Sequence, residues 1–275
     1  TIVQKATGER EKFDPSKLCA SLLDPGAPKD LAQNVCLAIE KKITPEVTTS
    51  QIFRDAVSYL IHEDIRTTAR YSLRRGLAML GPAGFLFEQY VEALMQAEGY
   101  ATERDLMIDG QCVDHEIDVL AKKGDEVILI EAKYRNQHEI KTHLDVVMYA
   151  DARKEDINQR VTKEKGVKPY DMWVVTNTRF TEKAIRYAQC RNMKLIGWKY
   201  PTHGHLQDLI TKHKLYPVTV LPSVSTFELE KFAEKGMILA QDLLPYQQQD
   251  LTREFGIPPE IARVILDEVF EIVKV

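Results

Sequence analysis

Residues 116–134 read EIDVLAKKGDEVILIEAKY, and this stretch decides the fold of the central part of the chain. Two apolar runs flank the polar segment 122–125, which contains glycine and is typical of a turn. The pattern predicts a β-hairpin whose second strand, over 126–134, sends Ile128 and Ile130 into the core. A strand this apolar is buried on at least one face, so charged side chains at its end need an explanation.

Three charged residues of this hairpin share one face. Side chains alternate along a strand, so Glu131 and Lys133 point the same way and Ala132 points the other way. A four-residue turn over 122–125 sets Asp118 opposite Leu129, on the face of Glu131 and one diagonal step from it. A slip of one residue would separate the two carboxylates, so the prediction depends on the register.

Two carboxylates and a lysine are the groups that hydrolysis of a phosphodiester requires. Asp118 and Glu131 supply the oxygen ligands that Mg²⁺ or Mn²⁺ prefers, and Lys133 can orient water or neutralise charge on a phosphoryl oxygen. Glu88, on the preceding helix, is a candidate third acid. His115 adjoins the site but is predicted to point away. The alternative is that these side chains are solvated strand residues.

The segment 81–216 around the hairpin alternates strands and helices after an initial meander, which predicts an α/β sandwich with a mixed sheet. Expected helices cover 84–98, 141–162, 181–191 and 206–214, and expected strands cover 100–108, 112–121, 126–134, 172–176 and 194–198.

The segments on either side are mostly helical. Residues 1–80 open with strands at 1–5 and 11–13, and Asp14-Pro15 is typical of a helix start. Gly81-Pro82 ends this block. Residues 217–275 read as an all-helical domain for packing or dimerisation. The expected helices cover 15–22, 28–42, 48–62 and 64–79 before the central domain, and 226–235, 239–243, 246–255 and 259–275 after it.

The composition indicates an ordinary folded protein. Of 275 residues, 44% are hydrophobic and 28% are charged, which argues against disorder, and no apolar run reaches the ~18 residues of a membrane span. We expect a cytoplasmic protein. The four cysteines form no CxxC pair, which argues against a zinc ribbon, and all four are predicted to be reduced and mostly buried.

The net charge of -4 excludes a uniformly basic nucleic-acid binder but not one with a local basic face. Residues 216–275 carry five basic against ten acidic side chains, so that segment is poorly suited to phosphate. The strongest basic run, over 179–199, sets six cations against Glu182 and is the best candidate for contact with a phosphate backbone: Arg179, Lys183, Arg186, Arg191, Lys194 and Lys199.

The central domain resembles the Mrr-like restriction endonucleases of the PD-(D/E)xK superfamily. The likeness rests on the order of Phe87-Glu88, Ile117-Asp118, Glu131-Ala132-Lys133-Tyr134 and the later segment 176–181. It implies a DNA endonuclease in which Asp118 and Glu131 hold the metal, Glu88 assists and Lys133 is the catalytic lysine. Because each chain carries one such site, cutting both strands of DNA favours a homodimer.

Residues 1–78 resemble the ATP-cone, a regulatory nucleotide-binding domain. The likeness rests on Val3-Gln4-Lys5, Phe13-Asp14, Lys17-Leu18 and, later, Ala69-Arg70-Tyr71. It implies regulation by ATP or dATP, with Lys5, Lys17 and Arg70 facing the triphosphate. No GxxxxGK[ST] loop is present, so we expect binding without hydrolysis of the nucleotide.

Two other functions stay open from the sequence. The first is a non-catalytic, nucleotide-responsive DNA-binding regulator, which the absence of a cysteine-rich zinc ribbon disfavours. The second is a nuclease of the same fold that acts on RNA or on branched DNA, because junction resolvases share the same aspartate and Glu-x-Lys pattern. The sequence does not predict a recognition site or the direction of the nucleotide effect.

Overall fold

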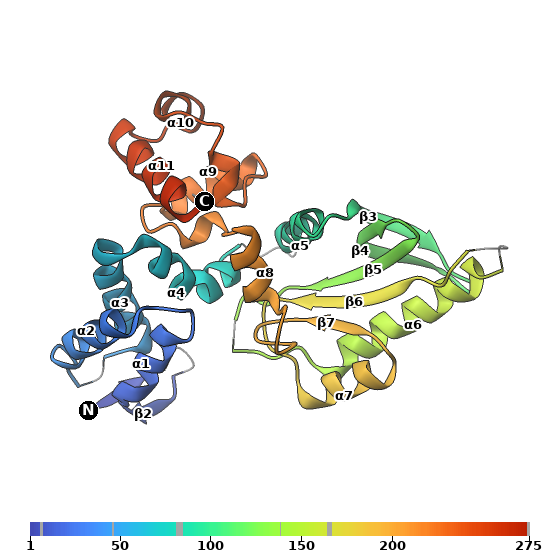
Figure 1. The fold of residues 1–275 in the computed structure, drawn as a ribbon, viewed down its shortest axis with the longest axis horizontal. Coiled ribbons are helices and arrows are strands. Elements are labelled where there is room, and N and C mark those ends of the chain that lie inside the picture. Colours follow the sequence, from blue (N-terminus) through green and yellow to red (C-terminus); the bar gives the residue numbers. More distant parts are fainter. Residues whose placement is uncertain (6–7, 46, 81–84, 138, 164–166, 274–275) are drawn as a thin grey trace. The chain divides into compact units, whose positions relative to one another are not determined.

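The structure, a computed structural model, describes residues 1–275 except 6–7, 46, 81–84, 138, 164–166 and 274–275 (Figure 1). The chain forms two compact units. The first contains residues 1–73, 220–229 and 243–275, and the second contains residues 74–219 and 230–242. The three domains expected from the sequence thus become two units, because most of the C-terminal segment joins the N-terminal one. The predicted boundary at Gly81-Pro82 lies outside the described residues.

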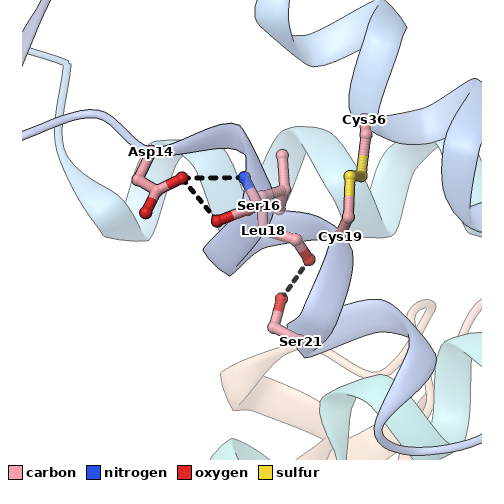
Figure 2. Close-up of a disulfide and its surroundings, with 6 residues drawn as sticks. All are labelled: Asp14, Ser16, Leu18, Cys19, Ser21 and Cys36. Atoms are coloured by element: carbon pink, nitrogen blue, oxygen red, sulfur yellow. Dashed lines mark hydrogen bonds between the residues drawn. A yellow bond between two sulfur atoms is a disulfide. The ribbon is translucent and has the colours of Figure 1, made fainter.

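The first unit begins with a small hairpin and a set of helices. Strand β1 (Ile2–Gln4) pairs antiparallel with β2 (Arg10–Lys12), and helices α1 (Pro15–Leu23), α2 (Lys29–Glu40), α3 (Thr49–Glu63) and the start of α4 (Ile65–Ala78) follow. The predicted helix start at Asp14 is confirmed, since its carboxylate accepts a 2.9 Å hydrogen bond from the Ser16 amide (Figure 2). Leu22, Ala56 and Leu60, which have no exposed surface, form part of the core of this unit.

The C-terminal helices pack in the same unit for identifiable reasons. Helices α10 (Gln248–Phe255) and α11 (Pro259–Val273) lie wholly within it, and α9 (Thr226–Glu234) starts there. Arg66 Nε on α4 donates a 2.9 Å hydrogen bond to the Glu271 carbonyl on α11. The buried Glu268 carboxylate accepts from the amide and the hydroxyl of Ser223. Contacts between residues some 200 positions apart leave no periodic signal in the sequence.

Two of the four cysteines form a disulfide, which corrects the expectation that all four are reduced. Cys19 on α1 and Cys36 on α2 are bonded, with their Cα atoms 5.8 Å apart (Figure 2). The two helices are consecutive and pack side by side, so cysteines 17 positions apart meet. The expectation of burial is also wrong for Cys112 and Cys190, which are free and exposed.

The second unit is an α/β sandwich around a mixed sheet, as the sequence predicts. Within the described residues the strand order is β3-β4-β5-β6-β7, with antiparallel pairing from β3 to β5 and parallel pairing from β5 to β7. The strands are β3 (Ala101–Asp109), β4 (Asp114–Lys123), β5 (Glu126–Lys133), β6 (Asp171–Thr176) and β7 (Lys194–Ile196).

Helices cover the two faces of this sheet (Figure 1). Helices α6 (Leu144–Val161) and α7 (Glu182–Cys190) pack on one face, where their buried Val147 and Ala184 meet Leu129 and Val174 of the strands. Helix α5 (Phe85–Ala97) packs on β3, β4 and β5 and contacts α8 (Leu206–His213). In the described part of the chain, no helix combines the length and the hydrophobicity needed to cross a bilayer.

The β4–β5 hairpin has a tighter turn than the sequence analysis predicts. Lys123 pairs with Glu126, so the turn is only the two residues Gly124 and Asp125, with Gly124 at φ +60°. Strand β4 therefore extends two residues further than expected, to Lys123, and Leu120, rather than Asp118, lies opposite Leu129. A register change of two residues keeps every side chain on its predicted face.

Candidate nuclease site

The β4–β5 ladder ends at the pair Val119–Ile130, and the two acids lie just beyond it. Beyond this pair, the Asp118 side chain takes the place of a backbone acceptor: its Oδ2 accepts a 2.6 Å hydrogen bond from the Ala132 amide. Continuing the register places Asp118 beside Glu131. We call Asp118, Glu131 and Ala132 the fork. It brings the two carboxylates predicted as metal ligands closer together than the diagonal arrangement expected from the sequence.

The fork is electrostatically strained. Burial and, after it, the neighbouring Glu131 charge raise the pKa of Asp118 to about 7, although the Ala132 amide and Arg153 partly oppose the shift. Two neighbouring carboxylates repel each other when both are ionised, and a bound divalent cation would compensate that repulsion. The donor set therefore fits Mg²⁺ or Mn²⁺.

Arg153 of α6 holds the second acid of the fork. Its Nη1 lies 2.7 Å from Glu131 Oε2, and both side chains are mostly buried. The guanidinium also stacks on the Tyr149 ring, 4.4 Å from its centroid. Tyr149 and Arg153 are four residues apart on one helix face. No sequence pattern singles out Arg153, because only the packing of α6 on the sheet brings it to Glu131.

Lys133 ends β5, two residues after Glu131, and is half-buried. Its carbonyl accepts a 2.7 Å hydrogen bond from Thr176 Oγ1 on the parallel neighbour β6, which fixes the backbone at this point. Across the described chain, no hydrogen bond or ion pair engages the Lys133 ammonium. The cation is therefore available to a substrate.

Glu88 of α5 pairs with an acid that the sequence analysis did not identify. Burial and the charge and hydrogen bond of Asp105 raise the pKa of Glu88. Asp105 has a left-handed backbone (φ +54°) and interrupts the β3–β4 pairing between Arg104–Val119 and Leu106–Ile117 without changing the register. Among the described residues, no three acidic, histidine or cysteine side chains converge into a metal-binding group. Mg²⁺ is commonly held by one or two carboxylates with water and substrate oxygens, which the fork alone can supply.

His115 points away from the fork and contacts α6. Its Nε2 lies 2.8 Å from Asp156 Oδ2. Asp156 also accepts from the amides of Cys112 and Val113, and these contacts lower its pKa to about 2. This group fastens the loop before β4 to the helix.

The residues predicted to face a nucleotide lie in the first unit. Lys5 and Lys17 both form 3.2 Å ion pairs with Glu11, and Lys5 also contacts Glu9 at 3.0 Å. Arg70 lies near Gly26, in the turn between α1 and α2. The structure thus groups the two lysines around one carboxylate.

The basic run 179–199 does not form one face. Arg191 forms ion pairs with two acids of α6: its Nε lies 2.6 Å from Asp151 Oδ2, and its Nη2 contacts Glu155. The Lys194 ammonium lies 3.6 Å from the centroid of the Trp173 ring. Arg179 follows β6, at the same sheet edge as Lys133.

Comparison with known proteins agrees with this geometry. The family described as "Restriction endonuclease" matches residues 83–199, and "AF1548-like, C-terminal" matches residues 216–273. An uncharacterized protein of Archaeoglobus fulgidus is 32% identical over 180 residues, which are 66% of this chain and 98% of the relative. The chain belongs to the AF1548-like family. The restriction-endonuclease match indicates a nuclease domain and implies a nucleic acid as substrate.

A similar solved structure supports the assignment to the AF1548-like family. The crystal structure of AF1548, titled a protein of unknown function, is 31% identical, with a TM-score of 0.56, and the match covers 69% of this chain and 98% of that one. Can2 from Sulfobacillus thermosulfidooxidans, solved with cyclic tetra-adenylate, is 14% identical with a TM-score of 0.35, and the match covers 74% of this chain and 64% of that one. The likeness to Can2 is too low to inform function.

Proposed function

We propose that this protein is a metal-dependent DNA endonuclease whose active site is the fork together with Lys133. The observation that carries the proposal is the pairing of Asp118 with Glu131 at the end of the β4–β5 ladder, inside the segment that matches restriction endonucleases. Asp118 and Glu131 would hold Mg²⁺ or Mn²⁺. Bound there, the ion would polarise a phosphoryl oxygen and acidify a coordinated water.

The side chains of the chain prepare this reaction. The Ala132 amide orients Asp118, and Arg153 orients Glu131. The Lys133 ammonium would donate a hydrogen bond to a non-bridging phosphoryl oxygen, where negative charge grows as water oxygen attacks phosphorus. One P–O ester bond would then break, the attacking water would lose a proton to solvent, and the leaving sugar oxygen would take up a proton from solvent. Glu88 and Asp105 lie outside this set and would act on it only through charge.

The experiment is cleavage of supercoiled plasmid with Mg²⁺ or Mn²⁺, comparing wild type with Lys133→Ala. Lys122→Ala is the matched control, because Lys122 lies on the same hairpin at the turn end, in a surface pair with Glu103. We expect wild type and Lys122→Ala to nick the plasmid and Lys133→Ala to lose at least about a hundredfold in rate. Equal rates for all three would refute the assignment of Lys133.

The alternatives give different results in this assay. DNA binding without cleavage would favour a regulator over a nuclease. Cleavage confined to four-way junctions or to RNA would favour a structure-selective or RNA-cutting enzyme with the same site. Each result would replace the proposed substrate class.

We propose, as a finer point, that ATP or dATP binds the first unit and regulates the nuclease. The support is the meeting of Lys5 and Lys17 at Glu11, where a triphosphate could replace the carboxylate. Fluorescent ATP should bind wild type and Lys29→Ala, whose lysine begins α2, and should bind Lys5→Ala at least about tenfold more weakly. Equal binding of ATP by both variants would contradict a nucleotide site at Lys5 and Lys17.

A homodimer would place two forks on one duplex, as cutting both strands requires. The mass of the DNA-bound protein, measured by light scattering, tests this expectation. A monomer that makes double-strand breaks without a nicked intermediate would contradict it.

A further inference from the structure

The loops that follow β5 and β6 are tied together by one buried amide. Asn177, directly after β6, has no exposed surface. Its Oδ1 accepts a 2.8 Å hydrogen bond from the Arg135 amide, and its Nδ2 donates a 2.7 Å bond to the Arg135 carbonyl. The backbone of Arg135, two residues beyond Lys133, is therefore fixed from both sides.

Three buried threonines form a hydrogen-bonded cluster that fixes the backbone of Arg179. Thr142 Oγ1 lies 2.9 Å from Thr176 Oγ1 and 3.3 Å from Thr178 Oγ1. The Thr142 amide donates a 2.8 Å hydrogen bond to the Arg179 carbonyl. The position of Arg179 is thus set as firmly as that of Arg135, and Arg179 itself is exposed.

These fixed positions gather positive charge at the edge where Lys133 ends β5. Burial lowers the pKa of Arg74 on α4, the positive charge of Arg179 lowers it further, and Glu139 opposes that effect. The Nε of Arg135 is buried and lacks a hydrogen-bond partner among the described residues. Arg74 and Arg179 thus lie close enough to affect each other, and Arg135, which has an unused donor, follows the strand that lies beside β6. Such a set of cations fits an anion with several oxygens.

We propose that Arg135 and Arg179 form a phosphate-binding subsite that grips the DNA backbone next to the phosphate presented to Lys133, with Arg74 supporting the positive field. The inference rests on the proposed nuclease function and gives the segment 176–181, otherwise unexplained by the fork, a role in substrate binding. Guanidinium groups suit this role because they can bind two phosphate oxygens at once.

The test is binding of a fluorescein-labelled 20-base-pair DNA duplex in EDTA, followed by anisotropy at several salt concentrations. Arg135→Gln and Arg179→Gln should each weaken binding about tenfold and lower the slope of log K against log salt by about one. Arg186→Gln, which removes an exposed charge from α7 of the same unit, is the matched control and should change binding less than twofold. Arg135→Lys should keep most of the salt slope.

The proposal would be overturned if wild type did not bind the duplex, or if all three glutamine variants weakened binding equally. It would also be overturned if Arg135→Gln had the salt slope and the melting temperature of wild type. The plasmid assay separates the two hypotheses. Wild type that binds with the expected arginine pattern but cleaves nothing would leave the subsite standing without the nuclease. Cleavage that is indifferent to Arg135 and Arg179, in rate and in KM, would leave the nuclease without the subsite.

Discussion

Asp118 and Asp156 lie in the same unit, yet their surroundings move their pKa values in opposite directions. Asp118 accepts one amide hydrogen bond, is partly buried beside Glu131 and has a pKa of about 7. Asp156 accepts from two amides and from His115 and has a pKa of about 2. A carboxylate whose acceptor sites are occupied by hydrogen bonds from the protein has a structural role. One that is buried, poorly hydrogen-bonded and close to another acid is suited to a cation.

The largest expected difference between the two is in catalysis. Asp118→Asn should lower plasmid cleavage by at least about a hundredfold, because a neutral amide is a poor ligand for Mg²⁺. Asp156→Asn should stay within about threefold of wild type, since its contacts lie in the loop before β4. Gel quantification at saturating Mg²⁺ measures both. Equal losses would abolish the distinction between a binding carboxylate and a structural one.

The two substitutions should also change stability in opposite directions. Without metal, Asp118→Asn should raise the free energy of unfolding by on the order of 2 kcal/mol at pH 8, because it removes a charge that the folded state disfavours. The folded pKa of Asp118, about 7, lies above its ordinary 3.8. The gain should therefore be absent below pH 4, grow up to about pH 7 and then level off. Urea titrations in EDTA from pH 4 to pH 8 test this, and a gain independent of pH would contradict it.

Arg153→Met should sharpen the comparison at Glu131. Removing the guanidinium leaves two neighbouring acids without their cation, so stability in EDTA should fall by about 1 kcal/mol. Added Mg²⁺ should restore more stability to this variant than to wild type. Arg160→Met on the same helix breaks only an exposed pair with Asp109 and serves as the control. Equal stabilisation by Mg²⁺ in all three proteins would argue against a cation site at the fork.

The smallest expected effect concerns Asp156 in acid. Its folded pKa, about 2, lies below the ordinary 3.8, so its stabilising contribution is complete above pH 4 and is lost as the pH falls through about 2. Asp156→Asn should lower the melting temperature at pH 6, and the difference from wild type should vanish near pH 2. A difference that persists at pH 2 would show that the hydrogen bonds do not depend on the charge.

The sequence predicts the strands of the hairpin, the face shared by its acids and the cap at Asp14, because each depends on local periodicity or on neighbouring residues. It misses the register by two residues, since nothing in Lys-Lys-Gly-Asp distinguishes a two-residue turn from a four-residue one. Arg153 and Asp105 are not identifiable, because Arg153 reaches Glu131 only through the packing of α6 on the sheet, and Asp105 has a left-handed backbone that no sequence pattern indicates. The Cys19–Cys36 bond likewise depends on how two helices pack.

The backbone passes between the two units four times, after residues 73, 219, 229 and 242. Neither unit is therefore a contiguous stretch of chain. A protease that nicks one of these connections leaves both units tethered by the other three. A nicked protein should run as an intact particle on a sizing column and show its fragments only after denaturation, because the Cys19–Cys36 disulfide lies within one fragment.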